Sequence, residues 1–317
     1  MSLTEPSKGG FKPFRYPWAY DYWLKHEKIH WLADEVPMGD DVRQWPTMDI
    51  KSRLLATSIM RMFVQADIDV HACYHKIFQS IFKPTEVAMM LSSFSNRETV
   101  HIQAYSHLLD TLGLPEEEYG AFLEYEEMKA KHDFMQSFDP KNPHEVALAL
   151  AGVSAFGEGL QLFASFAVLL NFPRQNLLKG MGQMVSWSVR DESLHCEGIM
   201  RLFHAYVAEQ SIDRGKLDED IIAMCRRVVE TEDKFIDLAF AGGDVPGLTA
   251  AELKQYIRYM ADLRLRGLGI APIYGIDRNP LPWVDSQAVG IEHANFFEQQ
   301  ATEYSKAATA GDWDDAF

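Results

Sequence analysis

The sequence has few cysteines, no excess of positive charge and almost no strand-like patterning. Its three cysteines, Cys73, Cys196 and Cys225, lie far apart and form no Cys-x-x-Cys pair. They are typical of reduced thiols in an intracellular protein and imply no disulfide framework. The chain has 30 Lys and Arg against 46 Asp and Glu, which gives a formal net charge of -16. This balance argues against direct binding of a nucleic-acid backbone through a basic surface.

Targeting and membrane signals are also missing. Residues 1–20 are polar, aromatic and interrupted by prolines, without the apolar core of a signal peptide. The apolar run at 146–172 is long enough to cross a bilayer, but Glu158 near its middle would be costly in lipid. Such a group is less costly in a helical bundle where it binds a metal. We therefore expect a buried helix, no membrane association and a cytoplasmic protein.

Apolar residues recur at spacings of three and four along most of the chain, which predicts an all-α protein. Proline and glycine mark the ends of the segments, and Gly215 is expected to break the chain before one of them. Helices are predicted at residues 18–30, 48–82, 86–112, 116–131, 143–173, 176–210, 217–241 and 250–267. No linker divides them, so we expect a single domain at 1–300 followed by a flexible acidic tail at 301–317.

Two copies of the pattern Glu-x-x-His carry the clearest chemical signal. Glu98 and His101 lie in the predicted helix 86–112, and Glu192 and His195 lie in 176–210. A spacing of three places both side chains of each pair on one helix face. One such pair can arise by chance. Two of them in an all-helical chain match the inward-facing motif of dimetal carboxylate four-helix proteins.

Two further helices each offer one central carboxylate, Asp67 and Glu158. Each acidic residue alone could be an ordinary surface or capping group, but Glu158 lies in a helix too apolar to be exposed. Four carboxylates and two imidazoles on four helices suit a dinuclear manganese or iron centre better than a thiolate-preferring metal. Asp69, two residues beyond Asp67, is a second possible ligand.

Spacing alone leaves the roles of three nearby residues open. Tyr105 lies one turn beyond His101, close enough to lose an electron and a proton to a metal centre, yet a helix tyrosine is usually core packing. Trp31 has the same ambiguity because aromatics crowd the N-terminal segment. Asp191 could hydrogen-bond a metal-binding histidine or be a plain helix acid.

Several segments together resemble the small, radical-generating (beta) subunit of class I ribonucleotide reductase, over essentially the whole chain. They are Trp31-Leu32-Ala33-Asp34-Glu35-Val36, Phe63-Val64-Gln65-Ala66-Asp67, Glu98-Thr99-Val100-His101-Ile102-Gln103-Ala104-Tyr105, Phe156-Gly157-Glu158, Arg190-Asp191-Glu192-Ser193-Leu194-His195 and Asn295-Phe296-Phe297-Glu298. The resemblance implies a ferritin-like dimetal-carboxylate bundle with extra helices. It implies two ligand sets joined by a bridging carboxylate, Asp67, Glu98 and His101 for one metal and Glu158, Glu192 and His195 for the other.

The resemblance also implies a route for an oxidising equivalent. Tyr105 would be the radical tyrosine, and Trp31 and Asp191 would connect the metal site through His101 to the surface. Tyr304 in the tail would pass the equivalent to the large (alpha) subunit.

The expected function is that of the small subunit of a ribonucleoside-diphosphate reductase. The end of the tail, 312–317, resembles the peptide that docks the large subunit, and a homodimer is expected. A dimetal site activated by an oxygen species would store the equivalent at Tyr105 or on the metals. The segment 65–74 resembles a less common subgroup that favours manganese, so a dimanganese centre is preferred. Asp67 is preferred over Asp69 because it follows the Phe-x-x-Ala pattern of the family. The alternatives are an oxidase of the same fold that acts on a small or lipid-like ligand, and a metal-storage bundle.

Overall fold

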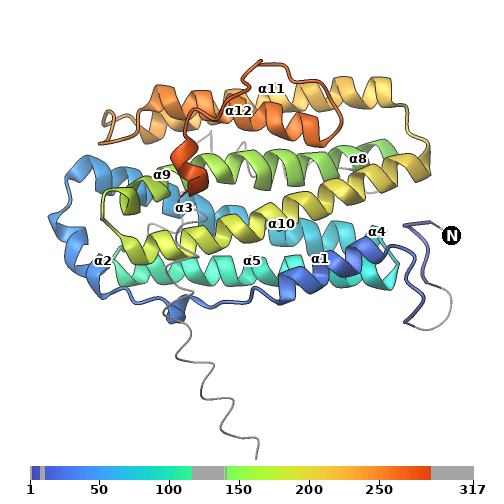
Figure 1. Cartoon of the computed structure of the whole chain (residues 1–317), viewed down its shortest axis with the longest axis horizontal. Helices are drawn as coiled ribbons and strands as arrows, with labels where there is room; N and C mark the ends of the chain where they lie inside the picture. The colour runs from blue at the N-terminus through green and yellow to red at the C-terminus, as the bar shows by residue number, and fades with distance from the viewer. Residues whose placement is uncertain (1, 8–10, 116–138, 140, 287–317) are drawn as a thin grey trace, which may run out of the picture.

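The computed structural model describes residues 2–7, 11–115, 139 and 141–286, and within these ranges the protein is helical with no β-strand (Figure 1). The first half contains α1 (Pro17–Glu27), η1 (Ala33–Glu35), α2 (Gly39–Gln44), η2 (Trp45–Thr47), α3 (Ile50–Ala72), η3 (Cys73–Phe78), α4 (Gln79–Ile81) and α5 (Thr85–Thr111). The second half contains α8 (Pro143–Ala151), η5 (Gly152–Gln161), α9 (Leu162–Arg174), α10 (Lys179–Gln210), α11 (Arg214–Ala239) and α12 (Ala250–Gly267). The all-α prediction is confirmed.

Four long helical runs enclose the core: α3, α5, the continuous run α8–η5–α9, and α10. α3 packs on α5, and α10 packs against α8, η5, α9 and α5. α11 and α12 form a further layer over the α8–η5–α9 run, at the top of Figure 1. α1 covers α5 and α10 on the opposite side. These contacts bring the central turns of the four runs together inside the bundle.

The run α8–η5–α9 is the core helix of the bundle. Among the described residues, it is the one helical run, Pro143–Arg174, that is long and apolar enough to cross a membrane, with mean hydropathy 1.6, and its apolar stretch is completely buried. Helices of the same chain surround it, so its apolar surface is removed from water without lipid. The prediction of a buried helix that carries Glu158 is confirmed.

Local capping explains most of the helix boundaries. The Thr249 side chain accepts a hydrogen bond from the backbone N–H of Glu252, and the Glu252 carboxylate accepts from the backbone of Thr249. This capping box starts α12 at the predicted residue. The predicted start of the helix 217–241 was wrong by about one turn. The carboxylate of Asp213 accepts from the backbone N–H of Gly215, so Gly215 lies in the first turn instead of breaking the chain before the helix.

Two of the four runs change to π-helical geometry close to the centre of the bundle, at η3 and η5. A π segment replaces the regular backbone hydrogen bonds of an α-helix with a wider spacing, and such segments occur often at functional sites. In η5, side chains from other helices donate to backbone carbonyls: Cys196 Sγ to that of Ser154, and Arg264 Nε to that of Gly159 at 2.8 Å. A Cβ atom at Gly159 would lie 2.6 Å from Arg264 Nε. Glycine is therefore required where these groups meet the helix.

Three predicted features lie outside the described residues: the helix 116–131, the last part of the predicted domain, and the tail 301–317 with Tyr304. The division of the chain into a domain and a docking tail therefore stays a prediction.

Candidate metal centre

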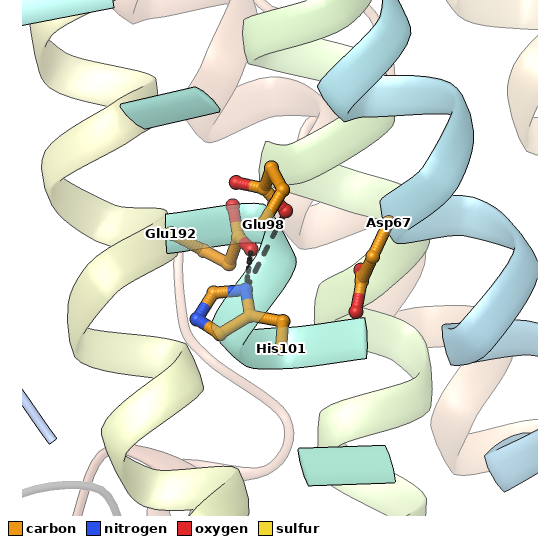
Figure 2. Close-up of side chains that lie close together, drawn as sticks. All are labelled: Asp67, Glu98, His101 and Glu192. Carbon is orange, nitrogen blue, oxygen red and sulfur yellow. Dashed lines mark ion pairs between the residues drawn. The ribbon is translucent and has the colours of Figure 1, made fainter. Parts of the chain in front are cut away.

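The six predicted ligands meet at the centre of the bundle, and each is at most 1% exposed. α3 supplies Asp67, α5 supplies Glu98 and His101, η5 supplies Glu158, and α10 supplies Glu192 and His195. Their donor atoms form two groups, and in each group the atoms lie within 4.8 Å of one another. The first group is Asp67, Glu98, His101 and Glu192 (Figure 2), and the second is Glu98, Glu158, Glu192 and His195.

Both groups include Glu98 and Glu192, so two adjacent cation positions would share these carboxylates. His101 Nδ1 lies 3.1 Å from Glu192 Oε1 and 3.5 Å from Glu98 Oε2. His195 Nδ1 lies 3.0 Å from Glu98 Oε1 and 3.2 Å from Glu192 Oε2. Each imidazole therefore presents Nδ1 to the shared carboxylates and turns Nε2 outward.

The donor atoms of this cluster leave hydrogen-bonding capacity unused. Among the described residues, no hydrogen-bond partner is found for either carboxylate oxygen of Glu98 and Glu192, for Asp67 Oδ2 or for Glu158 Oε2. Buried polar atoms without partners are costly. Carboxylate oxygens and imidazole nitrogens without a cysteine are ligands that manganese and iron accept. The residues present therefore fit a pair of such cations.

Electrostatics distribute protons unevenly over the cluster. Burial raises the pKa of Glu158 to about 8, and burial also raises the pKa of Asp67 well above its usual value. For Glu98, burial is outweighed by the neighbouring imidazoles of His101 and His195, and the pKa falls to about 2. Protons therefore occupy part of the cluster in the absence of cations, and cation binding must displace them.

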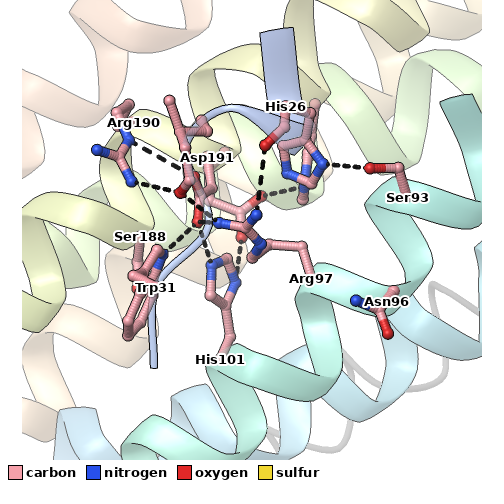
Figure 3. Close-up of polar contacts among 12 residues, drawn as sticks. His26, Trp31, Ser93, Asn96, Arg97, His101, Ser188, Arg190 and Asp191 are labelled. Carbon is pink, nitrogen blue, oxygen red and sulfur yellow. Dashed lines mark hydrogen bonds and ion pairs between the residues drawn. The ribbon is translucent and has the colours of Figure 1, made fainter. Parts of the chain in front are cut away.

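The outward nitrogen of His101 faces Asp191, which is one of the two roles that the spacing left open for this residue (Figure 3). Asp191 Oδ2 lies 3.3 Å from His101 Nε2 and accepts a hydrogen bond from Trp31 Nε1 at 2.7 Å. The centroid of the Trp31 ring lies 5.8 Å from that of the His101 ring and 5.2 Å from that of the Trp187 ring. Trp31, Asp191 and His101 thus form a continuous buried connection to the first ligand group.

Arg97 is a member of this network that the sequence analysis missed. Its guanidinium donates to Asp191 Oδ2 at 2.9 Å and to the backbone carbonyl of Ile29 at 3.0 Å. Arg190 donates to the same carbonyl at 3.0 Å. The two arginines therefore fix the segment that follows α1, which carries Trp31, beside Asp191 (Figure 3).

The outward nitrogen of His195 has a different partner, His26 of α1, which the sequence analysis also missed. The two Nε2 atoms lie 3.1 Å apart, and His26 Nδ1 lies 2.7 Å from Ser93 Oγ. The Ser93 hydroxyl donates to Glu27 Oε1 at 2.5 Å. Burial lowers the pKa of His26 to about 2, so this partner is neutral. The second histidine is therefore held by a neutral imidazole instead of a carboxylate.

Two buried tyrosines flank the ligand groups. The Tyr105 ring stacks on Phe63 at 4.4 Å, and no hydrogen-bond partner is found for its hydroxyl among the described residues. Burial, together with the negative charge of Asp67, raises the pKa of Tyr105 well above its usual value. Tyr74, which the sequence analysis did not select, donates its hydroxyl to Glu158 Oε1 at 2.6 Å. Asp69 joins neither ligand group and accepts a hydrogen bond from Gln65.

Comparison with known proteins places this arrangement in a family. The family described as "Ribonucleotide reductase, small chain" matches residues 10–280. A probable ribonucleoside-diphosphate reductase small subunit of Invertebrate iridescent virus 3 is 42% identical and aligns over 96% of this chain and 86% of its own length. The ribonucleoside-diphosphate reductase subunit beta of Chlamydia pneumoniae is 28% identical over 93% of this chain and 89% of its own.

Solved structures share the fold. The ribonucleotide reductase R2 subunit from Clostridium botulinum superposes with a TM-score of 0.84 at 22% identity, covering 91% of this chain and 94% of that one. The dimanganese(II)-NrdF structure from Streptococcus sanguinis gives a TM-score of 0.76 at 17% identity, covering 90% of this chain and 100% of that one. The predicted ferritin-like fold is confirmed, and the reductase prediction is favoured over the oxidase and storage alternatives. The chain belongs to the ribonucleotide reductase small-chain family.

Proposed function

We propose that the chain is the radical-generating beta subunit of a class I ribonucleoside-diphosphate reductase and works with a large subunit. One observation carries this proposal beyond the family match. Two buried ligand groups share the glutamates of the Glu-x-x-His pairs, and His101 of the first group is connected through Asp191 to the buried Trp31. A site for storage alone needs the ligands but not the connection. The connection gives an oxidising equivalent a way out of the bundle.

The six ligands divide between two cations. Asp67, Glu98 and His101 would hold one, and Glu158, Glu192 and His195 the other, with the shared glutamates placed to bridge. A dinuclear manganese or iron centre, once activated by an oxygen species, supplies the oxidising equivalent. Manganese is preferred because the segment 65–74 resembles the manganese-favouring subgroup.

The residues around the ligands prepare them for this role. Asp191 accepts from His101 Nε2–H and so leaves Nδ1 free to bind the cation. The same carboxylate orients the Trp31 indole against the His101 ring. The Tyr105 ring stacks on Phe63 and is buried away from water, where an oxidised side chain would be protected. Trp31 would pass the equivalent outward, and Tyr304 would deliver it to the large subunit.

Spectroscopy and turnover together test this function. Protein loaded with Mn(II) or Fe(II) and treated with oxygen, superoxide or hydrogen peroxide should give a tyrosyl-type or coupled high-valent metal signal by electron paramagnetic resonance. It should also support ribonucleotide reduction when mixed with its large subunit. Absence of both would refute the assignment. Anomalous scattering at the manganese and iron edges would identify the metal.

Docking and dimer formation are separate proposals with their own test. Removing residues 312–317 should abolish nucleotide reduction while leaving the spectroscopic signal intact, because the docking peptide lies apart from the ligands in the sequence. Sedimentation of the full chain should show a homodimer. A truncated chain with full activity would exclude the docking role.

A further inference from the structure

Tyr74 is a fully buried tyrosine that the radical route does not use. It lies in the π segment η3, seven residues beyond Asp67. A spacing of seven places two side chains on the same face of a helix, about 10 Å apart along its axis. Asp67 lies in the first ligand group. Tyr74, two turns further along the helix, contacts Glu158 of the second group. The two π segments meet through this side chain, because the partner of Tyr74 is Glu158 of η5.

The hydrogen bond from Tyr74 limits how Glu158 can lie. The Tyr74 hydroxyl donates to Glu158 Oε1 at 2.6 Å, and this oxygen lies 3.4 Å from His195 Nδ1. Glu158 Oε2 is buried and has no hydrogen-bond partner among the described residues. A glutamate side chain has three rotatable bonds, so it can bind a cation through one oxygen or through two. A fixed donor on one oxygen removes much of that freedom.

The donor itself is held rigidly. The Tyr74 ring packs edge-on against His195 and Phe94, each with ring centroids 6.0 Å apart. The same two rings, Phe94 and His195, lie 4.5 Å from each other. Tyr74 therefore touches both ligands of the second group that are not shared between the cation positions, one through its hydroxyl and one through its ring.

We propose that Tyr74 is a positioning residue of the second half of the metal centre, which holds Glu158 beside His195 in a single one-oxygen binding mode. This inference rests on the proposed function, because it requires that the cluster binds two cations. Without the hydroxyl, Glu158 would be free to rotate and bind through both oxygens. The second cation position should then lose affinity, and the first, which lacks Glu158, should not.

The test is Tyr74→Phe, which removes only the hydroxyl. Titration of the metal-free full chain with Mn(II), followed by the paramagnetic resonance signal of the free ion, should show two sites in the wild type. In Tyr74→Phe the affinity of the second site should fall about 10- to 100-fold, as is typical when a ligand loses its outer partner, and the signal of the bound Mn(II) pair should change shape. The matched control is Tyr256→Phe, which removes a buried hydroxyl on α12, outside the ligand groups.

Rescue separates positioning from packing. Replacing Tyr74 by 3-fluorotyrosine keeps a hydrogen-bond donor of nearly the same shape, so second-site affinity should match or exceed the wild type. Wild-type affinity and signal shape in Tyr74→Phe would overturn the proposal, and so would a loss of second-site affinity in the 3-fluorotyrosine protein. A wild-type chain that binds no pair of Mn(II) ions would instead refute the proposed function.

Discussion

The metal-free protein should lose stability as the pH rises from 6 to 8, because the ligand cluster holds protons that the unfolded chain releases. Burial raises the pKa of Glu158 from 4.5 to about 8, and that of Asp67 is raised as well. A group whose pKa is raised by folding stabilises the folded state at low pH, and this contribution disappears as the pH passes through the folded value. The change is about 1.4 kcal/mol per pH unit, so the loss of the Glu158 contribution should lower the free energy of unfolding by about 2 kcal/mol between pH 6 and 8.

The other members of the cluster modify this slope in known directions. The neighbouring carboxylates outweigh burial and raise the pKa values of His101 and His195. The unfolded chain releases these protons first, so the stabilising contribution of both residues also falls as the pH rises above 6.5. The lowered pKa of Glu98 gives a constant contribution above pH 4.5. The lowered pKa of His26 works in the opposite direction, with a gain of less than about 1 kcal/mol above pH 6. The net slope stays negative.

Urea denaturation followed by circular dichroism, with a chelator at pH 6, 7 and 8, measures this slope. Glu158→Gln cannot titrate and should flatten it, whereas Glu219→Gln, at an exposed position on α11, should leave it unchanged. Saturating Mn(II) should also remove the decline, because cations replace the protons. A wild-type midpoint that is constant or rises with pH, or an unchanged slope in Glu158→Gln, would refute the reasoning.

Three further substitutions probe the surroundings of the ligands. Tyr105→Phe removes a hydroxyl without a hydrogen-bond partner, so the free energy of unfolding should change by less than about 1 kcal/mol. Any tyrosyl signal should disappear. A large loss of stability would contradict the structure. Arg97→Met removes the closer of the two guanidinium groups beside the buried Asp191 carboxylate, at 2.9 Å against 3.7 Å for Arg190. It should destabilise the fold by about 3–5 kcal/mol in urea denaturation, with Arg97→Lys intermediate. His26→Phe removes the acceptor of His195 Nε2–H and should weaken Mn(II) binding about 10- to 100-fold in titration, whereas equal affinity would show that the contact has no role.

The ligand set was predictable because its signals are local. Glu98 with His101, and Glu192 with His195, are three residues apart, and the helical period around each pair is clear. Glu158 could be selected from the sequence because a carboxylate inside an apolar helix needs a cation or a hydrogen-bond donor beside it. Once four such helices pack around one core, side chains near their centres must meet. The helical fold and the convergence of the candidate ligands therefore followed from pattern and burial, whereas the choice of Asp67 over Asp69 rested on the family resemblance.

The outer partners were not predictable in the same way. Their partners are distant in the sequence: Tyr74, Arg97 and His26 contact residues 84, 94 and 169 positions away, and no motif pairs them with these partners. Tyr74 did have one usable signal, its seven-residue spacing from Asp67. Arg97 also had a usable signal, because it precedes an inward-facing glutamate, and an arginine that enters the core needs an anion beside it.

These outer partners make the two halves of the centre chemically different although their sequence motifs are the same. The outward nitrogen of His101 faces the anionic carboxylate of Asp191, and that of His195 faces the neutral ring of His26. An anionic acceptor on Nε2–H makes Nδ1 the more basic ligand. Trp31 donates to the same carboxylate as His101. The half with the more electron-rich imidazole is thus the half that contacts Trp31, the residue proposed to pass the oxidising equivalent outward.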